Sequence, residues 1–362
     1  MRVTTAKNAK NPKNPKNATA DKAARGVRLA GLAGDGRYAR YGPWAAGMVA
    51  VLAAIGLQSQ LYVGQERTVS AVFMFIVLAQ SWNLIGGFTG YASFGQVVFF
   101  GLGGYTTAVL MAHARWSYWP ALAVSGLVAA AYAALLGTPL LRLRGHYFAV
   151  ATLGVAEGTR ELVNNLSGLT GGGAGISVPT FGAKATTAYL GEDGFYILFL
   201  VLAAVTVATA GLVARSRFGL ALRAIHQDED AAASMGINTT RAKVSAFALS
   251  GLLTGLAGSA YTFQLVTVYP ENMFDVSITV LMVIMVVIGG SGTILGPLLG
   301  AVALQFLSEW LRQSFTEAHT FILGAIIVVV VVLMPEGVVT YIREARRGHG
   351  LSPLTNVRRY RL

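Results

Sequence analysis

The chain has 362 residues, of which 54% are hydrophobic and only 12% are charged, and it contains no cysteine. A soluble domain carries about twice this charged fraction, so the composition indicates a membrane protein, and the lack of cysteine excludes disulfides and cysteine metal sites. The formal net charge of +12 is compatible with nucleic-acid binding as well as with membrane topology, so the positions of the charges decide between the two classes.

Residues 1–42 form a polar tail that is rich in Lys, Asn, Ala and Pro and shows no hydrophobic periodicity. Such a segment cannot bury a core, so we expect a disordered, basic cytoplasmic tail. Binding to anionic headgroups or RNA is the alternative, but no aromatic side chain interleaves the lysines. The first apolar run begins only near Pro43 and is about 20 residues long, so we expect no cleaved signal peptide.

Ten apolar runs follow the tail, with lengths suited to helices that cross about 30 Å of hydrocarbon. They cover residues 43–64, 68–86, 97–112, 118–140, 146–163, 194–214, 244–266, 274–290, 294–311 and 320–339. The predicted fold is all-α, with a polytopic helical membrane domain over residues 43–342 and a basic cytoplasmic tail over residues 343–362. Ten spans divide into two inverted sets of five, an arrangement common in transporters, although no repeat is visible in the residues.

The basic residues support this count and give an orientation. With the N-terminus in the cytoplasm, 23 of the 28 Lys and Arg residues lie inside, and the remaining five lie outside: Arg67, Arg115, Arg160, Lys184 and Arg312. Basic loops stay cytoplasmic, so both termini are predicted to be cytoplasmic. The same distribution accounts for the net charge without nucleic acid.

Small and polar residues interrupt the apolar pattern in "NLIGGFTGYASFGQVVFFGLGGY" (83–105). Irregular backbone at membrane depth is tolerated only inside protein or along a cavity, so we expect either a re-entrant segment beside a pathway or a short cytoplasmic turn. Asn83, Ser93 and Gln96 are candidates for the walls of a translocation path. Hydrogen bonding between helices is the favoured alternative for Asn83 and Gln96.

Glu157 lies more than halfway along the span 146–163 and is the fourth candidate for the path. An ionisable residue at membrane depth calls for a functional hypothesis. Arg160 lies three residues further on, on the same helix face, so a local ion pair is the competing hypothesis. The sequence favours neither the functional role nor the ion pair.

Several glycines recur at helical spacing. Gly292, Gly296 and Gly300 are four residues apart, as are Gly251 and Gly255, which predicts close helix packing. The outer connection 164–193 also contains glycines, and with Pro179 they argue against a regular element. A loop of this length is often functional, and we expect it to cap the outer mouth or to receive a partner.

The sequence offers no site for chemistry. The clusters "GLTGGGAG" (168–175) and "GGSGTILGPLLG" (289–300) lack the Gly-Lys-Ser/Thr of a phosphate-binding loop, and neither follows a strand. The five histidines are scattered without the spacing of metal ligands, and no nucleophile–base set is present. We therefore expect no enzyme, no metal site and no cofactor bound by this chain.

The most polar internal segment is 215–243, which contains "FGLALRAIHQDEDAAASMGIN" (218–238). Ser216 is expected to cap one helix and Asp228 a second, short helix, which Gly236 is suited to end in a left-handed conformation. A helix on the lipid surface would need bulky apolar residues opposite basic ones. A capped helix with a small-residue face instead suits docking into a groove of a cytosolic protein.

From about Ser70 to Tyr341 the chain resembles permease subunits of branched-chain amino acid ABC importers, of the LivM type. The matching stretches are "WNLIGGFTGYASFGQVVFFGLGGYTTAVL" (82–110), "LRLRGHYFAVATLGVAEGTREL" (141–162), "LTGGGAGI" (169–176), "SRFGLALRAIHQDEDAAASMGINTTRAKVSAFALSGLLTGLAGSAY" (216–261), "VVIGGSGTILGPLLGA" (286–301) and "LMPEGVV" (333–339). Their order and spacing fit the family throughout.

The resemblance implies one half of a heterodimeric channel in the bacterial cytoplasmic membrane, paired with a second permease of related fold. Two cytosolic ATPase subunits would use ATP, and an extracytoplasmic binding protein would deliver leucine, isoleucine or valine. Carried over residue by residue, the family's ATPase-coupling segment falls on Arg223, Ala224, Asp228, Glu229, Ala232 and Gly236.

Alternatives to this function stay open at the sequence level. Asp230 and Ser234 stand where many relatives have an apolar residue and an acid, which bears on ATPase pairing. Importers of urea, amides and aromatic acids use close relatives of this permease, so the family does not fix the solute. A stand-alone secondary carrier would need an ion or proton site in the membrane, for which Glu157 is the best support.

Overall fold

The computed structural model describes residues 51, 54–56, 58, 62–180, 187–315 and 318–333, and its helices and strands belong to the unit Ile55–Leu362. The main helices are α3 (Val63–Thr89), α4 (Gln96–Ala112), α5 (Tyr118–Leu140), α6 (His146–Asn165), α8 (Gly191–Arg215), α11 (Thr239–Leu265), α13 (Val276–Gly289), α14 (Leu295–Ser314) and α15 (His319–Leu333). Shorter elements are α7 (Ser167–Thr170), η1 (Gly172–Ala174), β1 (Ile176–Ser177), α9 (Arg217–Gln227), α10 (Glu229–Ser234), β2 (Thr267–Val268) and α12 (Pro270–Met273). The predicted tails and most of the first predicted span lie outside the described residues.

The nine main helices lie where the second to tenth spans are predicted. Five segments are long and apolar enough to cross a membrane: Gly64–Thr89, Tyr118–Leu140, Gly191–Arg215, Thr239–Leu265 and Pro270–Gly289. An all-α membrane fold is therefore confirmed, while the count of ten spans stays a prediction. Segment 83–105 is α3 and α4 joined through residues 90–95, with Gly90 in a left-handed conformation at φ 77°.

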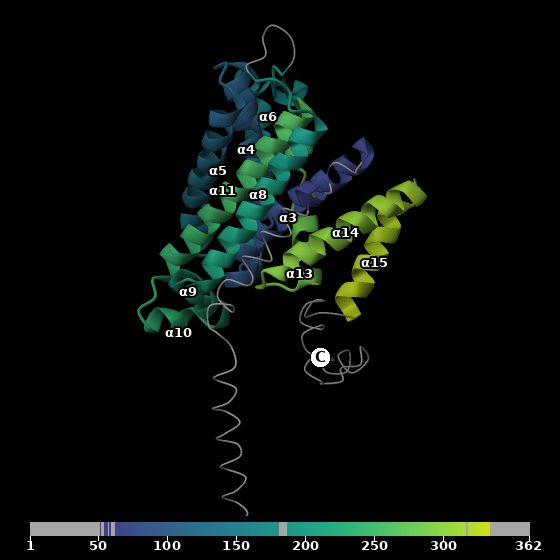
Figure 1. Ribbon diagram of the computed structural model, residues 1–362. Helices are drawn as coiled ribbons and strands as arrows, with labels where there is room; N and C mark the ends of the chain where they lie inside the picture. The colour runs from purple at the N-terminus through teal and green to yellow at the C-terminus, as the bar shows by residue number, and fades with distance from the viewer. Residues whose placement is uncertain are drawn as a thin grey trace, which may run out of the picture. The chain divides into compact units, whose positions relative to one another are not determined.

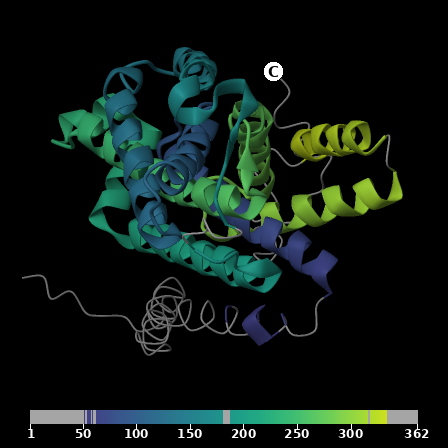
Figure 2. The same cartoon turned by 90° about the horizontal axis from the view of Figure 1, so that it is seen from above.

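Glycines allow the main helices to approach one another closely. Helix α11 packs against α4 and α5, and α3 packs against α8 (Figure 1). A side chain at Gly103 of α4 would overlap the backbone of Gly255 in α11, and one at Gly300 of α14 would overlap the carbonyl oxygen of Met285 in α13. The close packing predicted from glycine spacing is confirmed. Helices α14 and α15 lie side by side beyond α13 (Figures 1 and 2).

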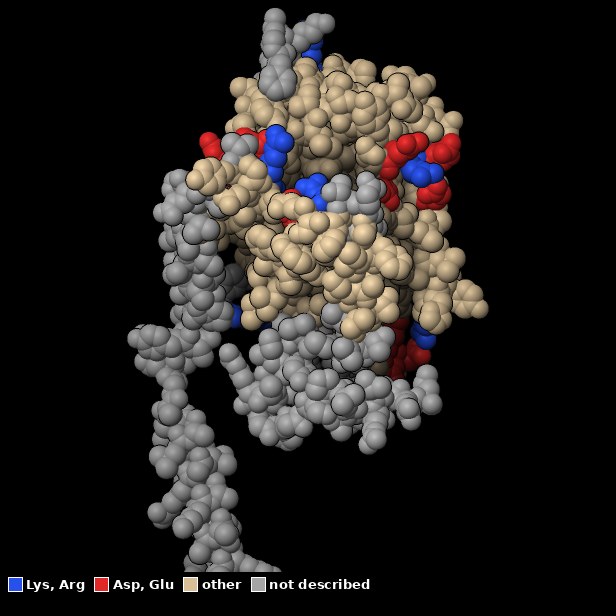
Figure 3. All heavy atoms as spheres, turned by 90° about the vertical axis from the view of Figure 1, so that its right-hand side faces the viewer, with Lys and Arg blue, Asp and Glu red and all other residues tan. Residues whose placement is uncertain are grey.

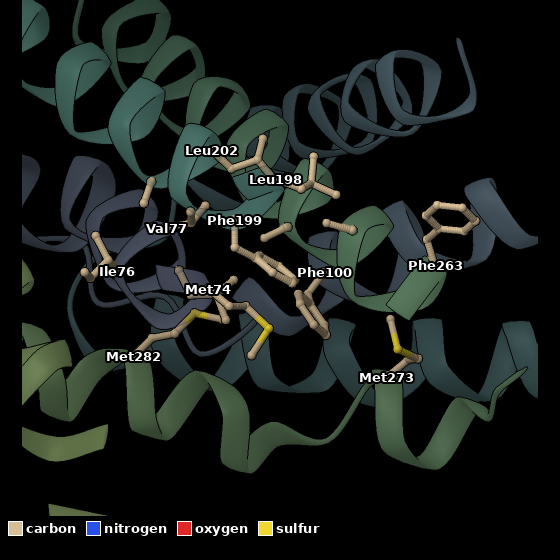
Figure 4. Close-up of a cluster of buried hydrophobic side chains, with 14 of the residues drawn as sticks. Met74, Ile76, Val77, Phe100, Leu198, Phe199, Leu202, Phe263, Met273 and Met282 are labelled. Atoms are coloured by element: carbon tan, nitrogen blue, oxygen red, sulfur yellow. The ribbon is translucent and has the colours of Figure 1, made fainter. Parts of the chain in front are cut away.

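A large apolar cluster fills the space between α3, α4, α8, α11 and α13. Phe100, Phe199 and Phe263 are each at most 1% exposed. In the same cluster Met74 and Met282 lie on the side of Phe199, and Met273 lies near Phe263 (Figure 4). Lipid is as apolar as leucine, so close packing rather than removal from water holds such helices together. The charged groups on the face in Figure 3 form small clusters of mixed sign in a largely uncharged surface.

The connections between helices meet at two opposite ends, as the alternation of the spans predicts. At one end, Arg144 from the α5–α6 connection bonds Asp230 of α10, and α9 and α10 lie together at the lower end of Figure 1. At the other end, β1 pairs antiparallel with β2, and the Arg67 guanidinium lies 2.6 Å from the Glu192 carboxylate. The three connections α3–α4, α5–α6 and α8–α11 therefore share one surface.

The outer segment differs from its predicted irregular character. Its described part contains α7, η1 and β1, because Gly171 and Gly175 adopt positive φ angles of 76° and 75° that allow the chain to turn sharply. The Thr170 hydroxyl donates a 2.6 Å hydrogen bond to the carbonyl oxygen of Val163, which ties the first turn back to α6. Glycine therefore permits short regular elements here rather than preventing them.

Candidate coupling site

The segment between α8 and α11 forms two capped helices with a break at Asp228, as predicted. The Ser216 hydroxyl accepts the N–H of Gly219 at 3.1 Å and starts α9. The Asp228 carboxylate accepts the N–H groups of Asp230 and Ala231, both at 2.9 Å, and starts α10. Both caps satisfy donors that have no partner within the helix.

Gly236 follows α10 in a left-handed conformation with φ 86°. No atom lies within 4 Å of the position that a Cβ would occupy there, so only the backbone conformation calls for glycine. This confirms the predicted helix end. The reversal at Gly236 returns the chain to α11 through Asn238, whose side chain caps that helix by accepting the N–H of Arg241.

Glu229 turns its carboxylate into the protein, where it meets a buried lysine of α11. The ammonium nitrogen of Lys243 lies 2.6 Å from Glu229 Oε1, and its side chain is only 3% exposed. The same ammonium donates to the carbonyl oxygen of Leu141 at 2.8 Å and to the Tyr91 hydroxyl at 2.9 Å. Its three N–H donors thus have three acceptors, as a buried charge requires.

Tyr91, in the α3–α4 connection, completes this cluster. Its hydroxyl donates to Glu229 Oε2 at 2.5 Å, and its ring centroid lies 4.4 Å from the Lys243 ammonium, a cation–π contact. Burial and the neighbouring Glu229 carboxylate raise the pKa of the Tyr91 hydroxyl, so it stays protonated and able to donate. We call Glu229, Lys243, Tyr91 and the Leu141 carbonyl the Lys243 network.

The electrostatics of the network favour an ionised Glu229. Burial on its own would raise the pKa of Glu229, but hydrogen bonds from Lys243 and Tyr91, with the positive charges of Lys243 and Arg144, outweigh it, and the pKa is lowered overall. The neighbouring Asp230 carboxylate is more exposed and receives two hydrogen bonds from Arg144, at 2.7 and 3.1 Å. These bonds lower the pKa of Asp230 as well.

The candidate coupling residues do not all face outward. Ala232 is 3% exposed and packs against the chain, whereas the neighbouring Ala231, Ala233 and Ser234 are exposed. Met235, which directly follows α10, is 79% exposed. The outward face of α10 therefore carries small side chains beside the exposed carboxylate of Asp230, and its role in docking stays a prediction.

Arg223 and Ala224 lie on α9, beside the end of α8. The Arg223 guanidinium donates to the carbonyl oxygen of Ala214 at 3.2 Å and lies 5.6 Å from the ring centroid of Phe88 in α3. The imidazole of His226 lies 3.2 Å from the carbonyl oxygen of Gly87, near the end of α3. Helix α9 is thus held against two main helices while α10 projects beyond it.

Asn83 joins α3 to the turn that precedes α14. Its amide donates to the carbonyl oxygen of Thr293 at 2.8 Å and accepts the N–H of Gly292 at 2.9 Å, and the residue is fully buried. Both the nitrogen and the oxygen of the amide therefore form hydrogen bonds to the turn before α14. This geometry favours the helix-joining alternative for Asn83, although a role in the path stays a prediction.

Gln96 and Ser93 are also fully buried. The Gln96 amide nitrogen donates to the hydroxyls of Ser250 and Thr254 at 2.5 and 3.1 Å, which joins α4 to α11. Its carbonyl oxygen and the Ser93 hydroxyl have no hydrogen-bond partner in the described part of the chain, and neither amide atom of Gln80 in α3 has one. Gln80 was not singled out from the sequence, because one glutamine in a long helix carries no distinguishing pattern.

Glu157 forms the local ion pair with Arg160 that the sequence offered as one alternative. Its side chain is 54% exposed. A groove of about 500 Å³ lies between α5 and α6 and does not include Glu157; it is lined by Tyr132, Leu136, Leu140, Ala151, Gly154, Val155, Gly158, Thr159 and Leu162. No group of His, Asp or Glu side chains suited to a metal ion occurs among the described residues.

The fold defines an all-α membrane protein, and the comparisons give its family. The family model described as the permease component of branched-chain amino acid transport systems matches residues 65–331, and the chain belongs to this family. This confirms the resemblance found in the sequence.

Three relatives show how far the similarity extends. The chain is 31% identical over 319 residues to the high-affinity branched-chain amino acid permease protein LivM of Salmonella typhimurium, covering 82% of this chain and 75% of the relative. It is 31% identical over 303 residues to LivM of Escherichia coli, with coverage of 77% and 71%. The fructose import permease protein FrcC of Rhizobium meliloti is 29% identical over 127 residues, or 34% of this chain and 35% of FrcC. No solved structure matches the chain.

Sequence reasoning missed Tyr91, Lys243 and Arg144 as members of the site. They lie on three segments that meet only in the fold, and Tyr91 and Lys243 are 152 residues apart. One signal was present: Lys243 falls at the start of a long apolar helix, where a lysine calls for an acidic partner.

Proposed function

We propose that the chain is the membrane-spanning permease subunit of an ABC importer for branched-chain amino acids. The strongest support for this function is the family match over residues 65–331, together with similarity to two LivM proteins over most of each chain. The chain carries no phosphate-binding loop motif, so ATP is hydrolysed by two cytosolic ATPase subunits. This permease binds no cofactor of its own and catalyses no reaction.

The assembly contains a second, related permease and an extracytoplasmic binding protein that delivers the solute. The chain crosses the cytoplasmic membrane ten times, with both termini in the cytoplasm, and its spans form two inverted sets of five. The strong excess of Lys and Arg in the segments assigned inside supports this orientation. The disposition of the described connections at two opposite ends is compatible with it.

Transport proceeds by alternating access driven by the ATPases. Closure of the ATPase dimer pushes on α10, and the push reorients the main helices around a central passage. Arg223, Ala224, Asp228, Glu229, Ala232 and Gly236 form the coupling segment in this proposal. The exposed small face of α10, ending in Met235, supports docking into an ATPase groove.

Asn83, Ser93, Gln96 and Glu157 are candidates for the wall of the passage. The unpartnered hydroxyl of Ser93 and the unpartnered amide oxygen of Gln96 support their part in this set, since buried polar groups without partners are uncommon. Few charges are needed there, because a zwitterion must be bound only transiently while it passes.

Two alternatives concern the solute and the energy source. Fructose and ribose import permeases match shorter parts of the chain, so the wider family takes chemically different small solutes, and urea or amides are further alternatives. A stand-alone carrier would rely on Glu157 as an ion or proton site. The exposed ion pair of Glu157 with Arg160 gives the stand-alone carrier little support.

Purification of the native complex tests the proposal. The chain is expected to co-purify with a second permease and two ATPase subunits, and the binding protein of the system is expected to carry leucine, isoleucine or valine. A complex whose binding protein carries urea, an amide or a sugar would replace the proposed solute. A chain that purifies without any ATPase and transports alone would contradict the proposal.

A further inference from the structure

The Lys243 network joins four segments that are distant in the sequence. Glu229 belongs to α10, Lys243 to α11, Tyr91 to the α3–α4 connection, and Leu141 follows α5. All the polar contacts between them lie between 2.5 and 2.9 Å. A displacement of α10 therefore acts directly on the α3–α4 connection, the end of α5 and the start of α11.

The other attachments of α10 are weaker or less specific. Ala232 packs against the chain with a single methyl group, and the pair between Arg144 and Asp230 joins side chains that are 61% and 78% exposed. Exposed pairs of this kind contribute little because water screens them. The buried pair of Lys243 and Glu229, with side chains 3% and 16% exposed, is the firm polar link.

A buried, fully hydrogen-bonded charge has few alternative arrangements. Moving Glu229 by more than a hydrogen-bond length would leave the Lys243 ammonium unpaired in a place that water does not reach, which is costly. Groups held in this way shift together as a body, because packed interiors do not deform continuously. The network is thus suited to transmit a displacement rather than to absorb it.

We propose that Lys243 is the positioning residue that makes α10 move as one body with the α3–α4 connection, the end of α5 and α11. This inference rests on the proposed function. It adds the residue through which a displacement of α10 by the ATPases reaches the membrane helices. The side chain of Lys243 is only 3% exposed. It acts through Glu229, Tyr91 and the Leu141 carbonyl.

The test measures coupling in the complete importer, reconstituted in proteoliposomes with its ATPases and solute-loaded binding protein. The readout is the number of solute molecules imported per ATP hydrolysed. A merely structural role would reduce the number of intact complexes and lower both rates together, which leaves this ratio unchanged. The ratio therefore separates positioning from stability.

The main variant is Lys243→Met combined with Glu229→Gln, which removes both charges and so leaves no unpaired ion. We expect the ratio to fall about tenfold, within the 5–150-fold range typical of coupling between sites. The matched control is Arg312→Gln, which breaks the 2.7 Å pair with Glu309 on α14, and we expect it to stay within about twofold of wild type.

A milder variant keeps the proposal testable if the double variant does not assemble. Tyr91→Phe removes one hydroxyl and leaves the Lys243–Glu229 pair, and we expect the ratio to fall about threefold. An unchanged ratio in Tyr91→Phe, or in the double variant, overturns the inference. A wild-type complex that imports no solute with ATP overturns the proposed function instead, so the two failures are distinguishable.

Discussion

Gly236 and Glu229 show how single residues fix the geometry of α10. Gly236 is required for its backbone angle alone, since the space around it is open. Glu229 lies in the first turn of α10, where a carboxylate also favours the positive end of the helix dipole, and its side chain reaches back to Lys243. One residue ends the helix, and the other fastens it to the membrane domain.

Two substitutions of Gly236 distinguish the effect of its left-handed backbone conformation from the effect of adding a side chain. Gly236→Val forces a β-branched residue into a left-handed conformation at a cost of about 1–2 kcal/mol, whereas Gly236→Asn meets the same open space and tolerates that conformation. We expect the valine variant to lose most of the ATP hydrolysis stimulated by the solute-loaded binding protein, and the asparagine variant to keep it. Equal activities in an ATPase assay of the two complexes would show that the left-handed turn does not matter.

The Lys243 network also predicts a dependence of stability on pH. The pKa of Glu229 in the folded chain lies below its ordinary value of 4.5, so the network stabilises the fold fully above that pH. This contribution is lost as the pH falls through the lowered pKa. In Glu229→Gln the Lys243 ammonium loses its charged partner at every pH, at a cost of about 3–5 kcal/mol at neutral pH.

Thermal unfolding in detergent from about pH 7 to about pH 3 checks this sign. The melting temperature of Glu229→Gln should lie well below that of wild type at neutral pH. The gap should begin to narrow below pH 4.5, where the carboxylate of the unfolded wild-type chain takes up a proton, and should narrow further as the pH falls through the lowered pKa of the folded chain. A gap that stays constant or widens on acidification would rule out the ionised pair.

At the scale of elements, the sequence predicts features that depend on residues close together in the chain and misses those that join distant segments. The caps at Ser216 and Asp228 and the turn at Gly236 involve neighbours in the chain, and the residues predicted all three. The Lys243 network and the pairing of β1 with β2 join residues that only the fold brings together, and the sequence indicated neither. The outer segment was predicted irregular from its glycines and Pro179, and the partner of its strand, about 90 residues away, gave no local signal.

The hairpin of α13 and α14 depends on close contact at glycine. Gly300→Ala places a methyl group against the carbonyl oxygen of Met285, so the two helices must separate, at about 1–3 kcal/mol. Gly154 on α6 meets no atom within 4 Å, and alanine is the better helix former by about 1 kcal/mol. Melting temperatures of the purified chain should fall for Gly300→Ala and stay level or rise for Gly154→Ala. The opposite order would refute this account of the packing.

At the scale of the whole molecule, the absence of cysteine makes the predicted orientation directly testable. Ser167 and Ser234 are both exposed, and they lie on the outer connection and on α10 respectively. In intact cells Ser167→Cys should react with a membrane-impermeant thiol reagent, and Ser234→Cys should react only after permeabilisation. The chain is expressed without its ATPases, so that the proposed docking face of α10 is not covered and both serines are exposed. Since the two substitutions are the same, the reverse pattern would invert the topology.

The family and the fold class follow from the sequence over most of the chain, because periodicity and motif order are properties of the sequence itself. The solute does not follow in the same way. The buried polar groups of α3 and α4 include Gln80 and Gln96, which have unpartnered amide atoms, and no sequence pattern distinguished those atoms. They become visible only when every hydrogen bond around them is counted.

We propose that this permease moves a branched-chain amino acid with energy from partner ATPases. The most direct measurement is uptake of labelled leucine by proteoliposomes that contain the whole complex, with binding protein on one side and ATP on the other. We predict uptake that requires ATP and is competed by isoleucine and valine. Uptake that persists without ATP and follows an imposed proton or sodium gradient would contradict the account.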